Sequence, residues 1–180
     1  QKLHSFFRHS DLVKAVAVTP DGSKIISTSD DNTVKVWDVE TGQELHFFFR
    51  HSGGVTALAV TSDSSKLVSG SWDGRVNVWD LETGQELLSL SGHSSFVKAV
   101  AVTPDGSKIV SGSWDGRVKV WDVATGQELH SLSGHSHMIM AIYVTPDGSK
   151  LVSGSLDQTV KVWDIATGQE LHSFSNCSRG

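Results

Sequence analysis

Cysteine, tyrosine and proline are scarce in this 180-residue chain, which contains one cysteine, one tyrosine and three prolines. The single cysteine, Cys177, cannot form an internal disulfide, which excludes the small disulfide-stabilised class of protein. No apolar run approaches the roughly 20 residues that span a bilayer. The formal net charge is -5 and basic residues form no block, which argues against nucleic acid as a partner. We therefore expect a cytoplasmic protein that binds neither membranes nor nucleic acid.

Tryptophan, in contrast, occurs six times, and four of these residues are followed by aspartate. The Trp-Asp pairs begin at Trp37, Trp79, Trp121 and Trp163, so consecutive pairs start 42 residues apart. Residues 87–128 match residues 129–170 at 30 of 42 positions. A fixed period of this length is typical of repeat architectures. The sequence predicts a single array over residues 1–180, with repeats at 3–44, 45–86, 87–128 and 129–170 and an additional outer strand at 171–175.

Each repeat has the pattern of four short strands separated by turns. In the third repeat we expect strands at 87–91, 97–103, 108–113 and 117–123. Pro104-Asp105-Gly106-Ser107 and Asp115-Gly116 are turn sequences between them, because proline presets a negative φ and glycine permits a positive one. The valine-rich strands carry apolar residues on both faces, which indicates sheets stacked against other sheets. The expected fold class is all-β.

These features resemble the WD-repeat β-propeller family, and the resemblance covers nearly the whole chain. The shared elements are the Gly-His pairs at Gly92 and Gly134, the Pro-Asp-Gly turn, the Ser-Gly-Ser strand and the closing Trp-Asp. The evenness of the repeats is similar to that of amplified bacterial propellers. The sequence departs from the family pattern at Arg8 and Arg50, which precede histidine in place of glycine, and at residues 61–64, where Thr-Ser-Asp-Ser replaces the Pro-Asp-Gly turn. The resemblance implies a β-propeller with four blades per chain.

The resemblance also implies a buried hydrogen-bond relay of His, Ser, Asp and Trp in every blade. Such a set is physically reasonable, because a buried carboxylate needs donors and histidine can donate to it while accepting from serine. The predicted relay residues are His9, Ser27, Asp31 and Trp37; His51, Ser69, Asp73 and Trp79; His93, Ser111, Asp115 and Trp121; and His135, Ser153, Asp157 and Trp163.

The same residue types also allow a catalytic or a metal-binding interpretation. Ser, His and Asp form the triad of many hydrolases, but a catalytic site is normally single and this set occurs four times. Nine histidines could bind metal, yet those outside the relay, except His137, recur at one phase of the 42-residue repeat and so fall on different blades. We therefore predict no catalytic residue, no metal and no cofactor.

The four repeats differ most in the loops beside the relay histidine and aspartate, while the Thr-Gly-Gln-Glu turn is identical in all four. In a four-stranded meander these two loop sets lie at the same end of the blade, and the invariant turns lie at the other. Variation and aromatic residues on loops favour recognition, although neutral drift also varies exposed loops. The predicted partner-binding residues are Asp11, Asp30, Trp72, Phe96, Trp114, His137, Met138 and Leu156.

The predicted function is therefore a non-catalytic scaffold that binds a protein or peptide on the varied loops. Two alternatives stay open: a small-ligand or glycan binder, and an amplified or engineered self-assembling array with no evolved ligand. Residues 47–49, three consecutive phenylalanines, are either a contact patch or local packing, and the sequence does not distinguish the two.

The geometry of propellers predicts that four blades do not close alone. Twisted sheets that pack face to face prefer shallow crossing angles, and a ring of four blades needs a turn of about 90° between neighbours, whereas a ring of eight needs about 45°. We therefore expect a homodimer that forms one eight-bladed ring. The chain has five outer-strand sequences for four blades, and we expect residues 171–175 rather than 3–7 to complete the last blade, because a local hairpin loses less entropy.

Overall fold

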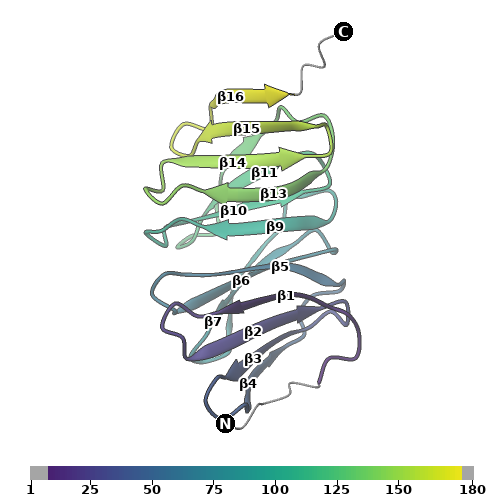
Figure 1. Cartoon of the computed structure of the whole chain (residues 1–180), viewed down its shortest axis with the longest axis vertical. Coiled ribbons are helices and arrows are strands. Elements are labelled where there is room, and N and C mark those ends of the chain that lie inside the picture. The colour runs from purple at the N-terminus through teal and green to yellow at the C-terminus, as the bar shows by residue number, and fades with distance from the viewer. Residues whose placement is uncertain (1–7, 176–180) are drawn as a thin grey trace.

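The computed structural model describes residues 8–175. Figure 1 shows four β-sheets stacked along the long, vertical axis of the molecule. Each sheet is a four-stranded antiparallel meander in sequence order. No helix long and apolar enough to cross a membrane occurs within these residues. The all-β architecture with four blade-like sheets, which the sequence predicts, is confirmed.

The strands of the four blades follow one another without a break. The first blade contains β1 (Val13–Val18), β2 (Lys24–Ser29), β3 (Val34–Asp38) and β4 (Glu44–Phe48). The second contains β5 (Val55–Val60), β6 (Lys66–Ser71), β7 (Val76–Asp80) and β8 (Glu86–Leu90). The third contains β9 (Val97–Val102), β10 (Lys108–Ser113), β11 (Val118–Asp122) and β12 (Glu128–Leu132). The fourth contains β13 (Ile139–Val144), β14 (Lys150–Ser155), β15 (Thr159–Asp164) and β16 (Glu170–Ser175).

The last blade is completed within its own chain, because β16 pairs along its length with β15. The other outer-strand sequence, residues 3–7, lies outside the described residues. The four strands expected in the third repeat lie within one residue of the observed ranges, the first as β8, which closes the second blade, and the others as β9, β10 and β11. Local turn chemistry therefore sets the register of each blade.

The turn that lacks Pro-Asp-Gly keeps the conformation of its counterparts. Ser64 has a φ of 58°, close to the 70° of Gly106 at the equivalent position. The turn is closed by hydrogen bonds to Asp63, which accepts from the Thr61 hydroxyl at 2.6 Å and from the Ser65 amide at 3.0 Å. Side-chain hydrogen bonds thus maintain a left-handed position that glycine occupies in the other blades.

A repeated apolar core joins each blade to the next. At the first junction, Val34 and Phe48 pack with Val55, Leu67 and Trp79 of the following blade. The other two junctions use the equivalent residues. The second and third blades approach their next blades closely at a glycine, since a Cβ on Gly70 would lie 2.6 Å from Val97 Cγ1, whereas the first blade has the buried Thr28 at the equivalent position.

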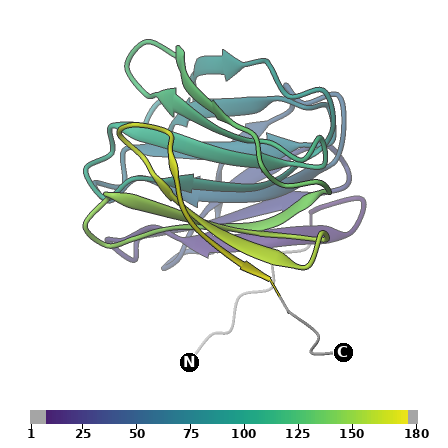
Figure 2. The ribbon, with the colours of Figure 1, turned by 90° about the horizontal axis from the view of Figure 1, so that it is seen from above.

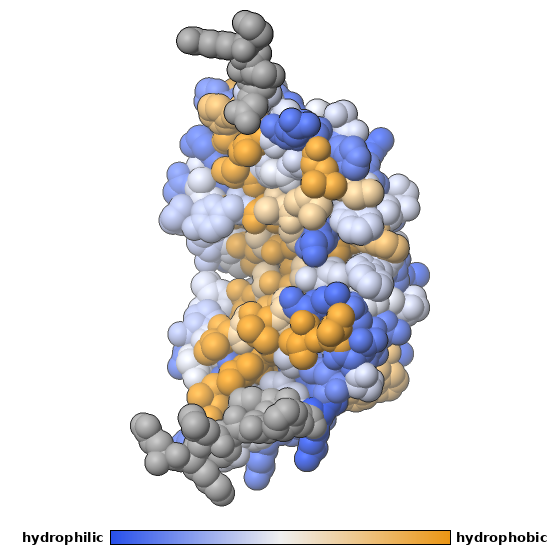
Figure 3. All heavy atoms as spheres, turned by 45° about the vertical axis from the view of Figure 1, so that its right-hand side comes forward, coloured by the Kyte–Doolittle hydropathy of each residue, from blue (hydrophilic) through white to orange (hydrophobic). Residues whose placement is uncertain are grey.

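The two ends of the stack lack this neighbour. Val13 is 52% exposed, whereas its equivalents Val55, Val97 and Ile139 are fully buried. At the other end Phe174 is 59% exposed, whereas Phe48 of the first blade is 4% exposed. Figure 3 shows hydrophobic side chains on the surface of the half that carries the first blade. Within the described residues the array is therefore open, with an apolar face at each end.

Candidate functional site

The loops lie at two opposite sides of the stack, as Figures 1 and 2 show. On one side, the loop before each innermost strand pairs with the turn after the second strand: the Trp72 amide donates to Gly54 O at 2.9 Å, and the Trp114 amide donates to Phe96 O at 2.9 Å. On the other side, the Leu81 amide donates to Ser65 O at 2.9 Å. We call the first side the varied loop face and the second, which carries the Thr-Gly-Gln-Glu turns, the uniform loop face.

The relay residues of each blade lie within hydrogen-bonding distance of one another. In the third blade, His93 Nδ1 lies 2.9 Å from Asp115 Oδ2 and His93 Nε2 lies 2.8 Å from Ser111 Oγ. Trp121 Nε1 donates to the same Ser111 Oγ at 2.8 Å. The pattern is consistent if the Nδ1–H of histidine donates to the carboxylate and its Nε2 accepts from the serine hydroxyl. The other blades have the same contacts, at His9, Ser27, Asp31 and Trp37; at His51, Ser69, Asp73 and Trp79; and at His135, Ser153, Asp157 and Trp163.

Each relay aspartate also holds the loops around it. Asp115 accepts from the Ser94 amide at 3.0 Å and the Arg117 amide at 2.9 Å. In the first blade Asp31 accepts in addition from the Thr33 hydroxyl at 2.6 Å, and Thr159 makes the equivalent contact in the fourth blade. The two threonines are relay members that the sequence analysis missed. Their signal was threonine two positions after the relay aspartate, at the site of Arg75 and Arg117.

These hydrogen bonds change the acidity of the relay carboxylates. Burial raises the pKa of Asp115, but the hydrogen bonds from His93 and the two loop amides outweigh it and lower the pKa to about 2. In the first blade burial likewise raises the pKa of Asp31, and the hydrogen bonds from Thr33, Ser10 and His9 lower it to about 2. The relay aspartates are therefore ionised throughout the neutral range.

The relay is not arranged for nucleophilic attack. Ser69, Ser111 and Ser153 are fully buried, and each hydroxyl oxygen also accepts from a buried tryptophan N–H. A hydrolase serine must present its oxygen to a substrate carbonyl, which this enclosure prevents. Among residues 8–175 no three His, Cys, Asp or Glu side chains come together as a metal site.

Three of the predicted partner-binding residues form an aromatic cluster on the varied loop face. The ring of Phe96 lies between Trp72, at 5.6 Å between centroids, and Trp114, at 5.1 Å. Lys14 lies 5.7 Å from the centre of the Trp72 ring and pairs with Asp30 at 2.7 Å. Side chains from three blades therefore make one continuous surface, with Trp72 40% and Phe96 37% exposed.

The remaining predicted residues lie on the same face but outside this cluster. Leu156 is exposed on the fourth blade, beside Met138, whose carbonyl oxygen accepts from its amide at 3.0 Å. Asp11 and His137 each accept from the amide of the next residue, at 2.7 and 2.9 Å, and are exposed. The tertiary structure thus divides the eight predicted positions into a cluster on blades one to three and separate positions on the first and fourth blades.

The three consecutive phenylalanines divide between local packing and exposure to solvent. Phe48 is 4% exposed and stacks on Trp79 of the next blade, with ring centroids 4.6 Å apart. Phe47 and Phe49 point outward, are exposed, and stack on each other at 5.7 Å. Strand alternation explains the split, because successive side chains point to opposite faces.

Comparison with known proteins agrees with this architecture. The sequence profile of the family described as WD domain, G-beta repeat matches residues 1–38, 42–80, 84–122 and 126–164. A stretch of 35 residues is 54% identical to the Ribosome biogenesis protein BOP1 homolog of Drosophila grimshawi and 51% identical to that of Drosophila melanogaster. The stretch covers 19% of this chain and only 4% of each relative. With four matches that span most of its length and four blade-like sheets, the chain belongs to the WD-repeat family.

Proposed function

We propose that the chain is a non-catalytic scaffold that binds a protein or peptide on its varied loop face. WD repeats imply a protein-interaction scaffold, and the aromatic cluster of Trp72, Phe96 and Trp114 carries the assignment of the face. Exposed aromatic rings supply most of the binding energy in many interfaces, because they bury a large area at low entropic cost.

Unsatisfied polar atoms support the same face. Within residues 8–175, three buried side-chain atoms have no hydrogen-bond partner, and two of them, Asp30 Oδ1 and Trp114 Nε1, belong to the loops of this face. Buried groups of this kind are rare in native proteins and often mark functional sites. On the uniform loop face, by contrast, the turn carboxylates are satisfied locally: Asp80 and Asp122 each accept from the threonine three residues later.

A peptide library displayed on phage and selected against the immobilised protein tests the proposal. Bound peptides should lose binding to the double variant Trp72→Ser, Trp114→Ser, while the far-ultraviolet circular dichroism spectrum of the variant stays that of the parent. The matched control is Thr83→Ala, Thr125→Ala on the uniform loop face, which should leave binding unchanged. The opposite pattern would refute the face assignment, and selection of glycans instead of peptides on an array would favour the small-ligand alternative.

We also propose that two copies join end to end as one eight-bladed ring. This proposal rests on the matching apolar surfaces that are exposed at the two ends. They are formed by Val13, Val16 and Val18 on the first blade, and by Val160 and Phe174 on the fourth. At every internal junction the equivalents of these two sets pack against each other. A twofold ring covers all four end faces, and apolar faces of this kind rarely stay in water.

Gly154 supports a junction at the end of the fourth blade. A Cβ on its equivalents Gly70 and Gly112 would lie 2.6 Å from a valine or isoleucine of the next blade, whereas a Cβ on Gly154 would meet nothing within 4 Å. The fourth blade therefore has the same glycine as the second and third blades, although the described residues of its own chain supply no neighbour there.

Light scattering on a sizing column tests the ring. The parent should have twice the chain mass of 19.4 kDa, and Val13→Lys and Gly154→Phe should each run as monomers, because both positions are open in the single chain. Deletion of residues 1–7 should leave the dimer intact, since β16 completes the last blade. A stable parent monomer at micromolar concentration would exclude the ring.

A further inference from the structure

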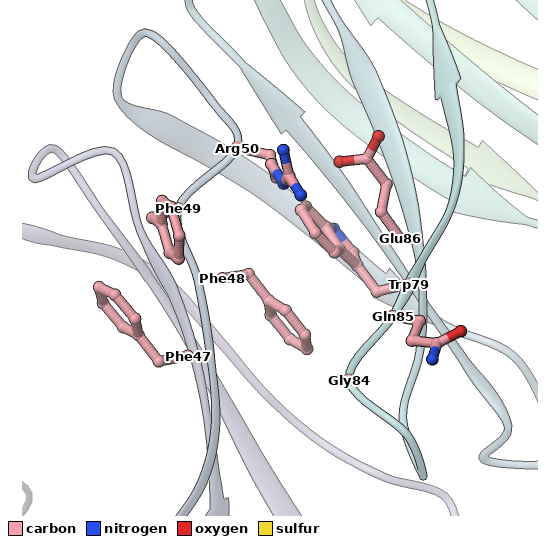
Figure 4. A pocket seen from close by; sticks show the side chains of 8 residues that line it. All are labelled: Phe47, Phe48, Phe49, Arg50, Trp79, Gly84, Gln85 and Glu86. Carbon is pink, nitrogen blue, oxygen red and sulfur yellow. The ribbon is translucent and has the colours of Figure 1, made fainter.

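A hollow opens on the outer rim of the molecule, between the first and second blades. Its volume is about 420 Å³, and Figure 4 shows the side chains around it. One wall comes from the end of β4 and the residues after it, and the other comes from Trp79 and the turn into β8. The lining residues are Phe47, Phe48, Phe49, Arg50, Trp79, Gly84, Gln85 and Glu86.

The other three blades show which group normally lies against the Trp and Glu of such a wall. In the third blade, Lys119 Nζ pairs with Glu128 at 2.6 Å and lies 5.7 Å from the centre of the Trp121 ring. In the first and fourth blades, the Lys35 and Lys161 ammonium groups make the same two contacts, with Glu44 and Trp37 and with Glu170 and Trp163. In these three blades, a carboxylate and an aromatic ring therefore bind an ammonium group that lies between them.

The second blade keeps the carboxylate and the ring but has no lysine. Asn77 stands at the equivalent position, 1% exposed, and accepts from the Ser89 hydroxyl at 2.9 Å. Among the described residues, Glu86 makes no hydrogen bond or ion pair, and no lysine or arginine nitrogen lies over the Trp79 ring. The second blade thus supplies no lysine to this position, which adjoins the hollow and lies beside Arg50.

The entrance is suited to an alkyl chain. Phe49 is 67% exposed and stacks on Phe47, while Phe48 packs on Trp79, so aromatic rings line the way to Glu86. Such surfaces cover the methylene stem of a lysine well. Arg50, which replaces the glycine of the third and fourth blades, lies at the top of the hollow between Phe49 and Glu86 (Figure 4), and is the one cation of the lining set that competes for Glu86.

We propose that this rim hollow binds a lysine side chain of a partner protein. The lysine ammonium lies between Glu86 and Trp79, where Lys35, Lys119 and Lys161 place theirs in the other blades, and its stem lies along Phe49. The site is distinct from the aromatic cluster of Trp72, Phe96 and Trp114, so the chain offers a second contact surface. Asn77→Lys provides a sharp test, because it fills the position from inside with the group that the sibling blades contain.

The probe is Nα-acetyl-lysine N-methylamide, followed by the indole N–H signal of Trp79 in a proton–nitrogen correlation spectrum of the whole chain. We expect the chemical-shift change to saturate at millimolar concentrations of the probe, because so small a ligand has few contacts. The norleucine analogue, which has the methylene stem without the ammonium, should bind at least tenfold more weakly. Equal shifts with the two compounds, or no saturable shift with the lysine compound, would overturn the proposal.

Three variants sharpen the result. Glu86→Gln and Asn77→Lys should each abolish the saturable shift, and Arg50→Gly, which restores the residue of the third and fourth blades, should strengthen binding several-fold. The control is Glu128→Gln in the third blade, which removes the equivalent carboxylate where the lysine is already present and should leave the Trp79 response unchanged. Retained binding in Asn77→Lys would show that the probe lies elsewhere and would refute the assignment.

Discussion

Replacement of Asp115 by alanine tests whether the relay supports the fold. The substitution removes the acceptor for three donors: the His93 ring N–H and the amides of Ser94 and Arg117. The third blade is the appropriate place, because blades pack against both of its faces. The His93 side chain is fully buried and that of Asp115 is 5% exposed, so we expect the ring nitrogen to lose its partner without regaining full hydration.

The magnitude follows from these three donors. A buried donor without a partner costs about 1–3 kcal/mol, and this cost applies to His93. The two amides lie in exposed loops and regain water, so each loses only the net value of about 0.5–1.5 kcal/mol. We expect the free energy of unfolding to fall by about 2–4 kcal/mol, somewhat less than the sum of the upper values because the loop relaxes.

Urea denaturation followed by tryptophan fluorescence measures this change. With a slope of about 2 kcal/mol per molar, the midpoint should fall by roughly 1–2 M. Asp122→Ala is the matched control, because Asp122 lies in the same blade but on the uniform loop face, where it accepts from Thr125 in an exposed turn. A midpoint for Asp115→Ala equal to that of the parent, or to that of the control, would refute a stabilising role of the relay.

Three further predictions concern packing and pH. Trp121→Ala should cost roughly 3–5 kcal/mol, because it removes a large buried aromatic from the junction and the N–H that donates to Ser111; calorimetry at constant protein concentration checks this. Gly112→Ala should lower the melting temperature, since the new Cβ would lie 2.6 Å from Ile139 Cγ2, and an unchanged temperature would contradict the packing of that junction. Because the folded-state pKa values of Asp31 and Asp115 are lowered to about 2, the stability that they contribute is present above their ordinary pKa near 4 and is lost as the pH falls from there towards 2. Urea midpoints between pH 5 and pH 2 should therefore fall less steeply for Asp115→Asn than for the parent.

The sequence by itself determined the number of blades and the approximate strand positions, and its resemblance to the WD-repeat family supplied the His, Ser, Asp and Trp members of each relay. These strand features are local to one 42-residue period: turn residues fix the hairpins, and apolar residues on both faces of the strands indicate stacked sheets. Even the turn at Ser64 could be placed by its phase, although it lacks the usual residues. The two threonines of the relay were missed because only two of the four blades contain them.

The tertiary structure decided everything that depends on contacts between blades. Val13 has the same sequence context as Val97, yet one is half exposed and the other fully buried, because only the second has a preceding blade. The aromatic cluster joins Trp72 and Trp114, 42 residues apart, through a Phe96 ring whose direction no period predicts. The replacement of lysine by Asn77 reads in the sequence as a minor variation. Only the packing of Phe48 on Trp79 and the hollow beside Glu86 make it part of the proposed lysine site, because a pocket is defined by neighbours that the chain brings together from different repeats.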